Sequence, residues 1–511
     1  RNGAEHEPWQ AEPMRGPGED RPSAWRAAAL LAVAAALGWW LVLAVRQIAD
    51  CGFYSDDFGI QWDWDSYGWW EAVETQTRVL GAKPILAFLL PTAYEVLGDD
   101  PAAHQALAVV LALGTAVAFY FVLRAMRFEV RDAVPIALLA LLFPWVSSVR
   151  LWPTGSLNNF AVLFLFAGLL LALRTLPARG SRGLLLHLPA TLLYLAAVLT
   201  YDATAAVAAA LWLLYLPLAG WRAAWPRALM DVAAVGAAAI WTREHTHKHV
   251  ADLADQLAHI VAGMAALRPG RPADGGPRTD GRPWALIAAG SLVALAACWA
   301  IYVPQAFYTP TFRGIEDRVN ILAVYPAAVL VWALLRAAGS LLPGGGYRAA
   351  ALGTAAIAVA YGVQDARQQS DWAEAAELQK PVVAAVERAE VPDGGLLLVF
   401  GSPGETAPGV PVFNQTWDLH PLAQILTGSS IHTYPVFEGA RLKCGADGLT
   451  IQELPSPLYW ELLIAQRGTP REFDYGQVAF VDAGGGSELI RSQSHCERAL
   501  DSFEPGPFRR R

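Results

Sequence analysis

The chain has 511 residues, of which 54% are hydrophobic and 16% are charged, with a formal net charge of -8. This composition is too apolar for an ordinary soluble globular protein. The basic residues are spread over many short loops, which argues against a nucleic acid partner. Apolar runs of roughly 17 to 22 residues recur, the length that a helix needs to cross a bilayer. The sequence therefore predicts a mainly α, polytopic membrane protein.

The apolar runs divide the chain into a membrane domain over residues 27–364 and two flanking regions. Residues 1–26 are polar and are expected to form a cytoplasmic tail. The run that follows is too long for a signal peptide and lacks the small-residue cleavage pattern, so we interpret it as a retained helix. Backbone groups in lipid need internal partners, so about eleven helical spans are expected. These are residues 27–48, 104–124, 132–149, 155–174, 184–200, 203–220, 227–242, 250–267, 284–303, 318–337 and 348–364.

Two segments decide on which side of the membrane each loop lies. Residues 84–98 are apolar but short, with Pro91 in the middle, and they are expected to form an interfacial helix. Residues 250–267 carry several polar groups. Counting them as a span places most Lys and Arg residues in cytoplasmic loops, as the positive-inside rule requires. The resulting topology puts the loop at residues 49–103 and everything after residue 364 on the outer face.

Residues 365–511 are expected to form a small extracytoplasmic α/β domain. A helical run at residues 371–389 precedes a β-rich run at 395–400 and irregular Pro- and Gly-rich sequence. The four cysteines fit no zinc or haem spacing. Cys444 and Cys496 both lie in this domain, in a compartment where disulfides persist, so we expect them to pair.

The first outer loop begins with the acidic and aromatic stretch FYSDDFGIQWDWDSYGWW, residues 53–70. One interpretation is a solvated loop with aromatic anchors at the membrane interface. The other is that one carboxylate of Asp56 and Asp57 accepts a proton from a hydroxyl nucleophile while its neighbour orients it or raises its pKa. Aromatic faces beside such a pair suit the C–H face of a sugar. The candidates for sugar contacts, or else for interface anchors, are Tyr54, Trp62, Trp64, Trp152 and Asp202.

Two cations, Arg78 and Lys83, precede the interfacial helix in the motif RVLGAKP. Such residues often contact lipid headgroups. Because they share a loop with the Asp pair, they are also candidates for neutralising a lipid phosphate that leaves during a reaction. Arg313 and Arg318, in a later outer loop, either complete this phosphate site or form salt bridges with their acidic neighbours.

Three alternating histidines in REHTHKH, His245, His247 and His249, form the remaining cluster. Histidine side chains bind zinc and other divalent ions. The spacing is not diagnostic, however, and solvent-exposed loop histidines are the alternative.

Several short motifs together resemble the integral-membrane glycosyltransferases of the GT-C superfamily. They are YSDDF after the first span, RVLGAKP, an interfacial segment ending LGDDP, a second span opening with His104 and Gln105, and FRGIEDRVN before a late span. The sequence is most similar to the members that use polyprenyl-phosphate sugars, such as O-antigen-modifying glucosyltransferases and protein mannosyltransferase-like proteins. Many members have Asp-Glu at the acidic pair, and glucosyltransferase-like members have Gly-Arg-x-Leu in place of GAKP, so the resemblance leaves the sugar open.

The resemblance implies that Asp56, beside Asp57, is the catalytic base and that Lys83 contacts the donor phosphate. We therefore expect an inverting glycosyltransferase in a bacterial cell membrane that moves a sugar from polyprenyl phosphate to a hydroxyl of a cell-surface glycan or cell-wall acceptor. The chemistry requires no cofactor, and participation of a divalent metal is left open. The alternatives are a flippase for a lipid-linked glycan, which favours internal repeats and broken helices, and a glycan-binding membrane scaffold without catalytic activity.

Overall fold

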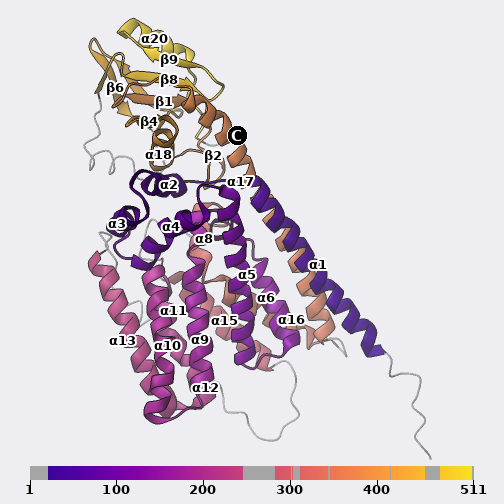
Figure 1. The fold of residues 1–511 in the computed structure, drawn as a ribbon. Coiled ribbons are helices and arrows are strands. Elements are labelled where there is room, and N and C mark those ends of the chain that lie inside the picture. Colours follow the sequence, from indigo (N-terminus) through magenta and orange to yellow (C-terminus); the bar gives the residue numbers. More distant parts are fainter. Residues whose placement is uncertain are drawn as a thin grey trace, which may run out of the picture.

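A computed structural model describes residues 21–245, 282–300, 302, 311–342, 346–414, 416–454 and 472–508. A bundle of helices carries a small α/β domain at one end, and short helices lie between the two parts (Figure 1). The expected fold class, a mainly α bundle with a small C-terminal α/β domain, is confirmed.

Five helical segments among the described residues are long and apolar enough to cross a membrane. They belong to α1 (Arg21–Asp50), α5 (Pro101–Ala125), α8 and α9 (Pro153–Ser156 and Asn159–Thr175), α10 (Gly180–Thr200) and α13 (Trp221–His245). Shorter apolar segments include α4 (Pro84–Leu97), α15 (Arg282–Ala300) and α16 (Val324–Gly339). The predicted count of eleven spans is therefore not confirmed, and the span predicted at residues 250–267 lies outside the described residues.

Several predicted spans are broken in the structure. The span predicted at 132–149 consists of α6 (Val130–Leu141), a turn and α7 (Ser148–Leu151). The span predicted at 203–220 is divided into α11 (Thr204–Ala210), the 3-10 helix η1 (Leu211–Tyr215) and α12 (Leu216–Ala219). Pro217 lies at the start of α12, where its missing N–H cannot continue the preceding hydrogen-bond ladder.

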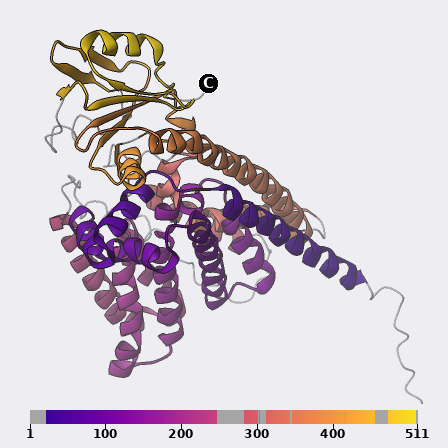
Figure 2. The same ribbon diagram turned by 45° about the horizontal axis from the view of Figure 1, so that its top comes forward.

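One long helix connects the bundle with the C-terminal domain. The predicted span at 348–364 and the predicted helical run at 371–389 are parts of α17 (Gly346–Glu387), which is 42 residues long. It lies beside α1 in both views (Figures 1 and 2). Gln369 of α17 donates to the Leu43 carbonyl of α1 at 2.8 Å. The C-terminal domain is therefore attached to the bundle through a continuous helix.

The C-terminal domain contains a four-stranded sheet in the order β4-β1-β8-β9. The strands β4 (His432–Pro435) and β8 (Val478–Asp482) run parallel to β1 (Leu396–Phe400), and β9 (Ser487–Ile490) is antiparallel to β8. All five β1 residues are buried, as expected for a central strand covered on both faces. The other elements are β2 (Glu405–Ala407), β3 (Val410–Pro411), β5 (Arg441–Cys444), β6 (Gly448–Glu453), β7 (Glu472–Asp474), α18 (Thr416–Thr427) and α20 (Gln493–Ser502).

A disulfide joins Cys444 and Cys496, the pair expected from the sequence. Their Cα atoms are 5.9 Å apart. The bond connects β5 with α20, so it holds the small three-stranded sheet (β5, β6 and β7) against the end of the domain.

The bundle contains a buried polar network between α10 and α13. His187 Nε2 lies 3.0 Å from Asp231 Oδ1, and both side chains are fully buried. The Asp231 carboxylate also accepts from Thr191 Oγ1 at 2.6 Å and from Tyr215 OH at 3.0 Å. Ionisable groups within a helix bundle are costly unless they have such partners. The network therefore ties three elements of the bundle together.

We expect Asp231→Ala to lower the free energy of unfolding in detergent by about 3 kcal/mol, because His187 and Tyr215 would lose their buried partner. Denaturant titration of the solubilised protein measures this loss. Glu244→Ala, at an exposed position of the same helix, serves as the control. Equal unfolding midpoints for the two variants would contradict the role of the network.

Candidate active site

The first loop predicted at residues 49–103 is folded into three short helices. They are α2 (Asp56–Tyr67), α3 (Trp69–Val79) and α4, which occupies the segment where the sequence predicts an interfacial helix. These helices lie at the end of the bundle next to the C-terminal domain (Figure 2). Asp56 and Asp57 are the first two residues of α2. The acidic pair is therefore presented where the bundle meets the domain.

Asp57 has a structural role in this arrangement. Its side chain is fully buried. One carboxylate oxygen accepts from the Tyr54 N–H at 2.8 Å, and the other accepts from the Thr154 N–H at 2.8 Å and from its hydroxyl at 2.5 Å. Burial raises the pKa of Asp57 to about 7, although these hydrogen bonds oppose the rise. Its carboxylate is thus occupied in fixing the start of α2 to α8.

Asp56 is the less constrained member of the pair. Its side chain is partly exposed, and the Ser55 hydroxyl lies 3.4 Å from Asp56 Oδ1. Burial raises the pKa of Asp56, and the charge of Arg318 opposes this rise. Ser55 itself has φ 50°, in the left-handed region that non-glycine residues seldom adopt. Of the two carboxylates, Asp56 is the one that can reach a bound molecule.

Two of the predicted phosphate ligands, Lys83 and Arg318, lie close to Tyr201. The Lys83 Nζ lies 3.4 Å from Asp202 Oδ1 and 5.0 Å from the centre of the Tyr201 ring. The Arg318 guanidinium lies 5.6 Å from the centre of the Trp152 ring. Burial raises the pKa of the Tyr201 phenol, and both Lys83 and Arg318 oppose this rise. Both cations are therefore close to Tyr201, and Arg318 also acts on Asp56.

The neighbouring Asp317 fixes the segment that carries Arg318. This segment forms the 3-10 helix η2 (Ile315–Asn320). The fully buried Asp317 carboxylate accepts from the backbone N–H groups of Ser147 and Ser148 at 2.6 and 2.9 Å and from their hydroxyls at 2.7 and 2.6 Å. Ser147 and Ser148 lie at the start of α7, so the Asp317 carboxylate also complements the dipole of that helix. Arg318 is consequently attached to α7, which leads directly to Trp152.

The other two predicted phosphate ligands make their described contacts elsewhere. Arg78 is exposed at the end of α3, where its guanidinium donates to Thr75 Oγ1 at 3.1 Å on its own helix. Arg313 is exposed, and its charge acts on Asp371 of α17. The structure therefore brings together Lys83 and Arg318, but it does not place Arg78 and Arg313 with them.

Two of the predicted sugar contacts belong to the core. Tyr54 is fully buried, its hydroxyl donates to the Trp372 carbonyl at 2.8 Å, and its ring packs against Trp372 at 4.7 Å. Trp152 is 2% exposed and donates its indole N–H to the Tyr54 carbonyl at 3.0 Å. Aromatic side chains with satisfied polar atoms are ordinary core residues. The burial of these two side chains lends no support to the predicted sugar contacts, which stay a prediction.

The remaining predicted contacts are accessible. Trp62 and Trp64 are partly exposed on α2, with Trp64 donating to Glu95 at 3.0 Å and Trp62 packing on Tyr67. Asp202 is also partly exposed, but its carboxylate pairs with Lys83. Both tryptophans are thus accessible aromatic side chains on the helix that begins with Asp56.

The histidine cluster is only partly described. His245 is the last residue of α13, and its ring stacks on Trp241 with the ring centres 3.9 Å apart. His247 and His249 lie outside the described residues. Over the ranges that the structure covers, no group of three His, Cys, Asp or Glu side chains is arranged to hold a metal ion.

Two residues that contact the acidic pair or its neighbour Ser55 are not predicted from the sequence. Thr154 binds Asp57, and Trp417 of the C-terminal domain donates its indole N–H to Ser55 Oγ at 3.3 Å. The Pro153-Thr154 dipeptide indicates a helix start at this position, because proline favours the first position of a helix. Trp417 carries no such signal, since it is 362 positions away from Ser55.

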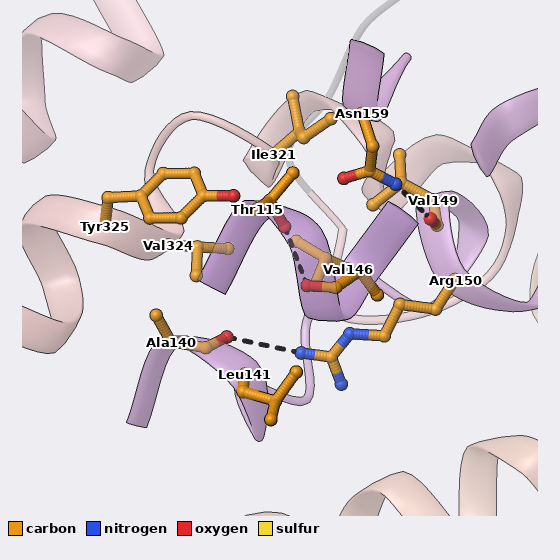
Figure 3. Close-up of a pocket in the computed structure, with 11 residues that line it drawn as sticks. Thr115, Ala140, Leu141, Val146, Val149, Arg150, Asn159, Ile321, Val324 and Tyr325 are labelled. Carbon is orange, nitrogen blue, oxygen red and sulfur yellow. Dashed lines mark hydrogen bonds between the residues drawn. The ribbon is translucent and has the colours of Figure 1, made fainter. Parts of the chain in front are cut away.

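A small cavity lies in the bundle, between α5, α6, α7, α9 and α16 (Figure 3). Its volume is about 30 Å³, room for about two water molecules. The Arg150 guanidinium beside it forms an ion pair with Asp365 at 2.9 Å, and the Asn159 amide donates to the Val149 carbonyl at 2.8 Å. The cavity is too small for a sugar and is separate from the residues around Asp56.

No protein-family model matches the chain, and no curated protein matches it. Among solved structures, it is similar to the archaeal oligosaccharyltransferase AglB from Archaeoglobus fulgidus in complex with an inhibitory peptide and a dolichol-phosphate, with 10% identity and a TM-score of 0.37. The oligosaccharyltransferase of that organism tethered with an acceptor peptide is similar with 10% identity and a TM-score of 0.36, and its apo form with 11% identity and a TM-score of 0.37. Each match covers 78% of this chain and 64% of the other, so the chain spans less than two thirds of the length of these proteins.

Proposed function

We propose that this chain is a membrane glycosyltransferase of the GT-C type. It transfers a sugar from polyprenyl phosphate to a hydroxyl group of a cell-surface glycan. The observation that carries the proposal is that Arg318 acts on the partly exposed carboxylate of Asp56 and shares the surroundings of Tyr201 with a second cation, Lys83. A base and a phosphate site side by side are what this transfer needs.

In the proposed reaction, the acceptor oxygen attacks the anomeric carbon as Asp56 takes the hydroxyl proton. The bond between the anomeric carbon and the phosphate oxygen breaks, and the lipid phosphate leaves with the bonding electrons. A single displacement of this kind inverts the anomeric configuration. Lys83 and Arg318 stabilise the charge on the departing phosphate, so the scheme includes no cofactor. Asp202, which pairs with Lys83 in the free protein, is displaced when the phosphate binds.

The proposed location of the reaction is the outer face of a bacterial membrane. The helix α2, which begins with the acidic pair, lies at the end of the bundle that carries the C-terminal domain (Figure 1). That domain contains the Cys444–Cys496 disulfide, and such bonds persist in oxidising compartments outside the cytoplasm. The positive-inside distribution of the short loops supports the same orientation.

The proposal is tested with the purified chain in nanodiscs, a set of polyprenyl-phosphate sugars and candidate acceptor glycans. We expect release of polyprenyl phosphate together with a glycosylated acceptor of inverted configuration. Nucleotide sugars serve as control donors, and parallel reactions with EDTA determine whether a divalent ion takes part. Transfer from a nucleotide sugar alone would overturn the proposed donor class.

The rate of transfer should fall as the pH decreases through the pKa of Asp56. Only the ionised carboxylate accepts a proton, and burial places this pKa above its ordinary value of 3.8. Arg318→Gln should move this acid limb to higher pH, because the arginine charge lowers the pKa of Asp56. Initial rates between pH 4 and pH 8 measure the limb. An identical limb in wild type and Arg318→Gln would show that another group titrates.

A further inference from the structure

We propose that Trp417 of the C-terminal domain is a positioning residue for Asp56, so that this domain completes the catalytic base of the membrane domain. The inference rests on the proposed role of Asp56. Trp417 lies on α18, which packs on α2. Its indole N–H donates to Ser55 Oγ at 3.3 Å, and the same hydroxyl lies 3.4 Å from Asp56 Oδ1. A hydrogen-bonded chain thus runs from the domain to the carboxylate.

The contact between α18 and α2 is close and has a defined register. A Cβ atom at Gly59 would lie 3.3 Å from the Trp417 carbonyl oxygen, so the absence of a side chain at Gly59 allows the approach. Next to it, the rings of Phe58 and Phe413 pack with their centres 5.6 Å apart. Trp417 is therefore held over the start of α2 by backbone and apolar contacts as well as by its own hydrogen bond.

The backbone at Ser55 shows why support is needed here. Its φ of 50° and ψ of -118° place it outside the ordinary regions for a residue with a side chain. Such conformations persist only where the surroundings enforce them. Trp152 holds the preceding carbonyl of Tyr54, and Trp417 holds the Ser55 hydroxyl. Loss of the indole N–H would allow Ser55 to relax and Asp56 to turn with it.

The groups that act on Asp56 come from three elements. Arg318 of η2 and the Trp417 N–H of α18 favour its charged form, and Asp57 is its acidic neighbour on α2. Two other described polar groups of α18 make contacts within the C-terminal domain. Asp418 accepts from the Asn414 N–H at 3.0 Å, and His420 Nδ1 accepts from the Thr433 N–H at 3.3 Å. Among the described side chains of α18, the Trp417 indole is the one that acts on the Asp56 carboxylate.

The test compares Trp417→Phe with Trp69→Phe in the full chain. Both changes remove an indole N–H donor. Trp69 of α3 donates to Thr92 Oγ1 of α4 at 3.1 Å. Trp417→Phe should lower kcat about tenfold or more, with little change in KM, because Asp56 is misplaced. The acid limb of the pH–rate profile of Trp417→Phe should move to higher pH by about one unit. Trp417→His keeps a ring N–H and should restore part of the kcat and part of the acid-limb position. Trp69→Phe should change neither kcat nor the acid limb.

A second measurement does not depend on sugar transfer. The Asp56 carboxyl band, identified as the infrared difference from Asp56→Asn, is titrated in the wild type, Trp417→Phe and Ser55→Ala. Both substitutions should raise the protonation midpoint, since each breaks the same chain of hydrogen bonds. An unchanged midpoint in both variants would overturn the inference. If the wild type transferred no sugar while both variants showed raised midpoints, the proposed function would be refuted and the role of Trp417 would remain.

Discussion

Asp56→Asn is expected to lower kcat for sugar transfer by about 10³-fold, because asparagine cannot accept the proton of the attacking hydroxyl. Donor binding should persist, since Lys83 and Arg318 remain. The measurement is the rate of polyprenyl-phosphate release at saturating donor, combined with a separate donor-binding titration. The expected result is therefore a loss of turnover without a matching loss of affinity.

Two other aspartates of α2 provide controls. Asp65 is exposed on the same helix, and Asp65→Asn should leave the rate unchanged. Asp57→Asn should lower stability, because one amide cannot accept all the hydrogen bonds from Tyr54 and Thr154. If Asp65→Asn and Asp56→Asn gave the same rate, Asp56 would not be the base.

Lys83→Met and Arg318→Gln are each expected to lower kcat/KM by about 100-fold, because each removes a charge that stabilises the leaving phosphate. The double variant should lose activity beyond assay detection. Initial rates over a range of donor concentrations separate the effect on affinity from the effect on turnover.

Arg78→Gln and Arg313→Gln are the matched controls for this pair. Both arginines are exposed, and their described contacts lie with Thr75 and Asp371. Their substitution should therefore change kcat/KM little. Losses equal to those of Lys83→Met and Arg318→Gln would place the phosphate site elsewhere in the outer loops.

Much of the architecture can be predicted because it depends on local hydrophobic pattern. The apolar runs mark α1, α5 and α10, and the short run at 84–98 marks α4. The acidic pair is also identifiable, since adjacent carboxylates between aromatic residues just after a span are chemically unusual. The same reasoning leads to Lys83 and Arg318, which lie in two separate loops that are both predicted to face the outer side of the membrane.

The features that the sequence does not reveal depend on distant contacts. Nothing in the local pattern distinguishes Asp56 from Asp57, because the difference arises from Thr154, which follows Asp57 by 97 positions. Tyr54 and Trp152 are aromatic residues whose burial is decided by packing between segments far apart in the chain. Such contacts require the tertiary structure.

The most direct measurement follows a radiolabelled polyprenyl-phosphate sugar in proteoliposomes that contain the full chain, an acceptor glycan and either wild type or Asp56→Asn. The proposed function predicts that the wild type forms one polyprenyl phosphate for each glycosylated acceptor and that Asp56→Asn forms both about 10³-fold more slowly. Movement of the intact labelled lipid between leaflets, with no glycosidic product, would contradict it and indicate a transporter of lipid-linked sugar.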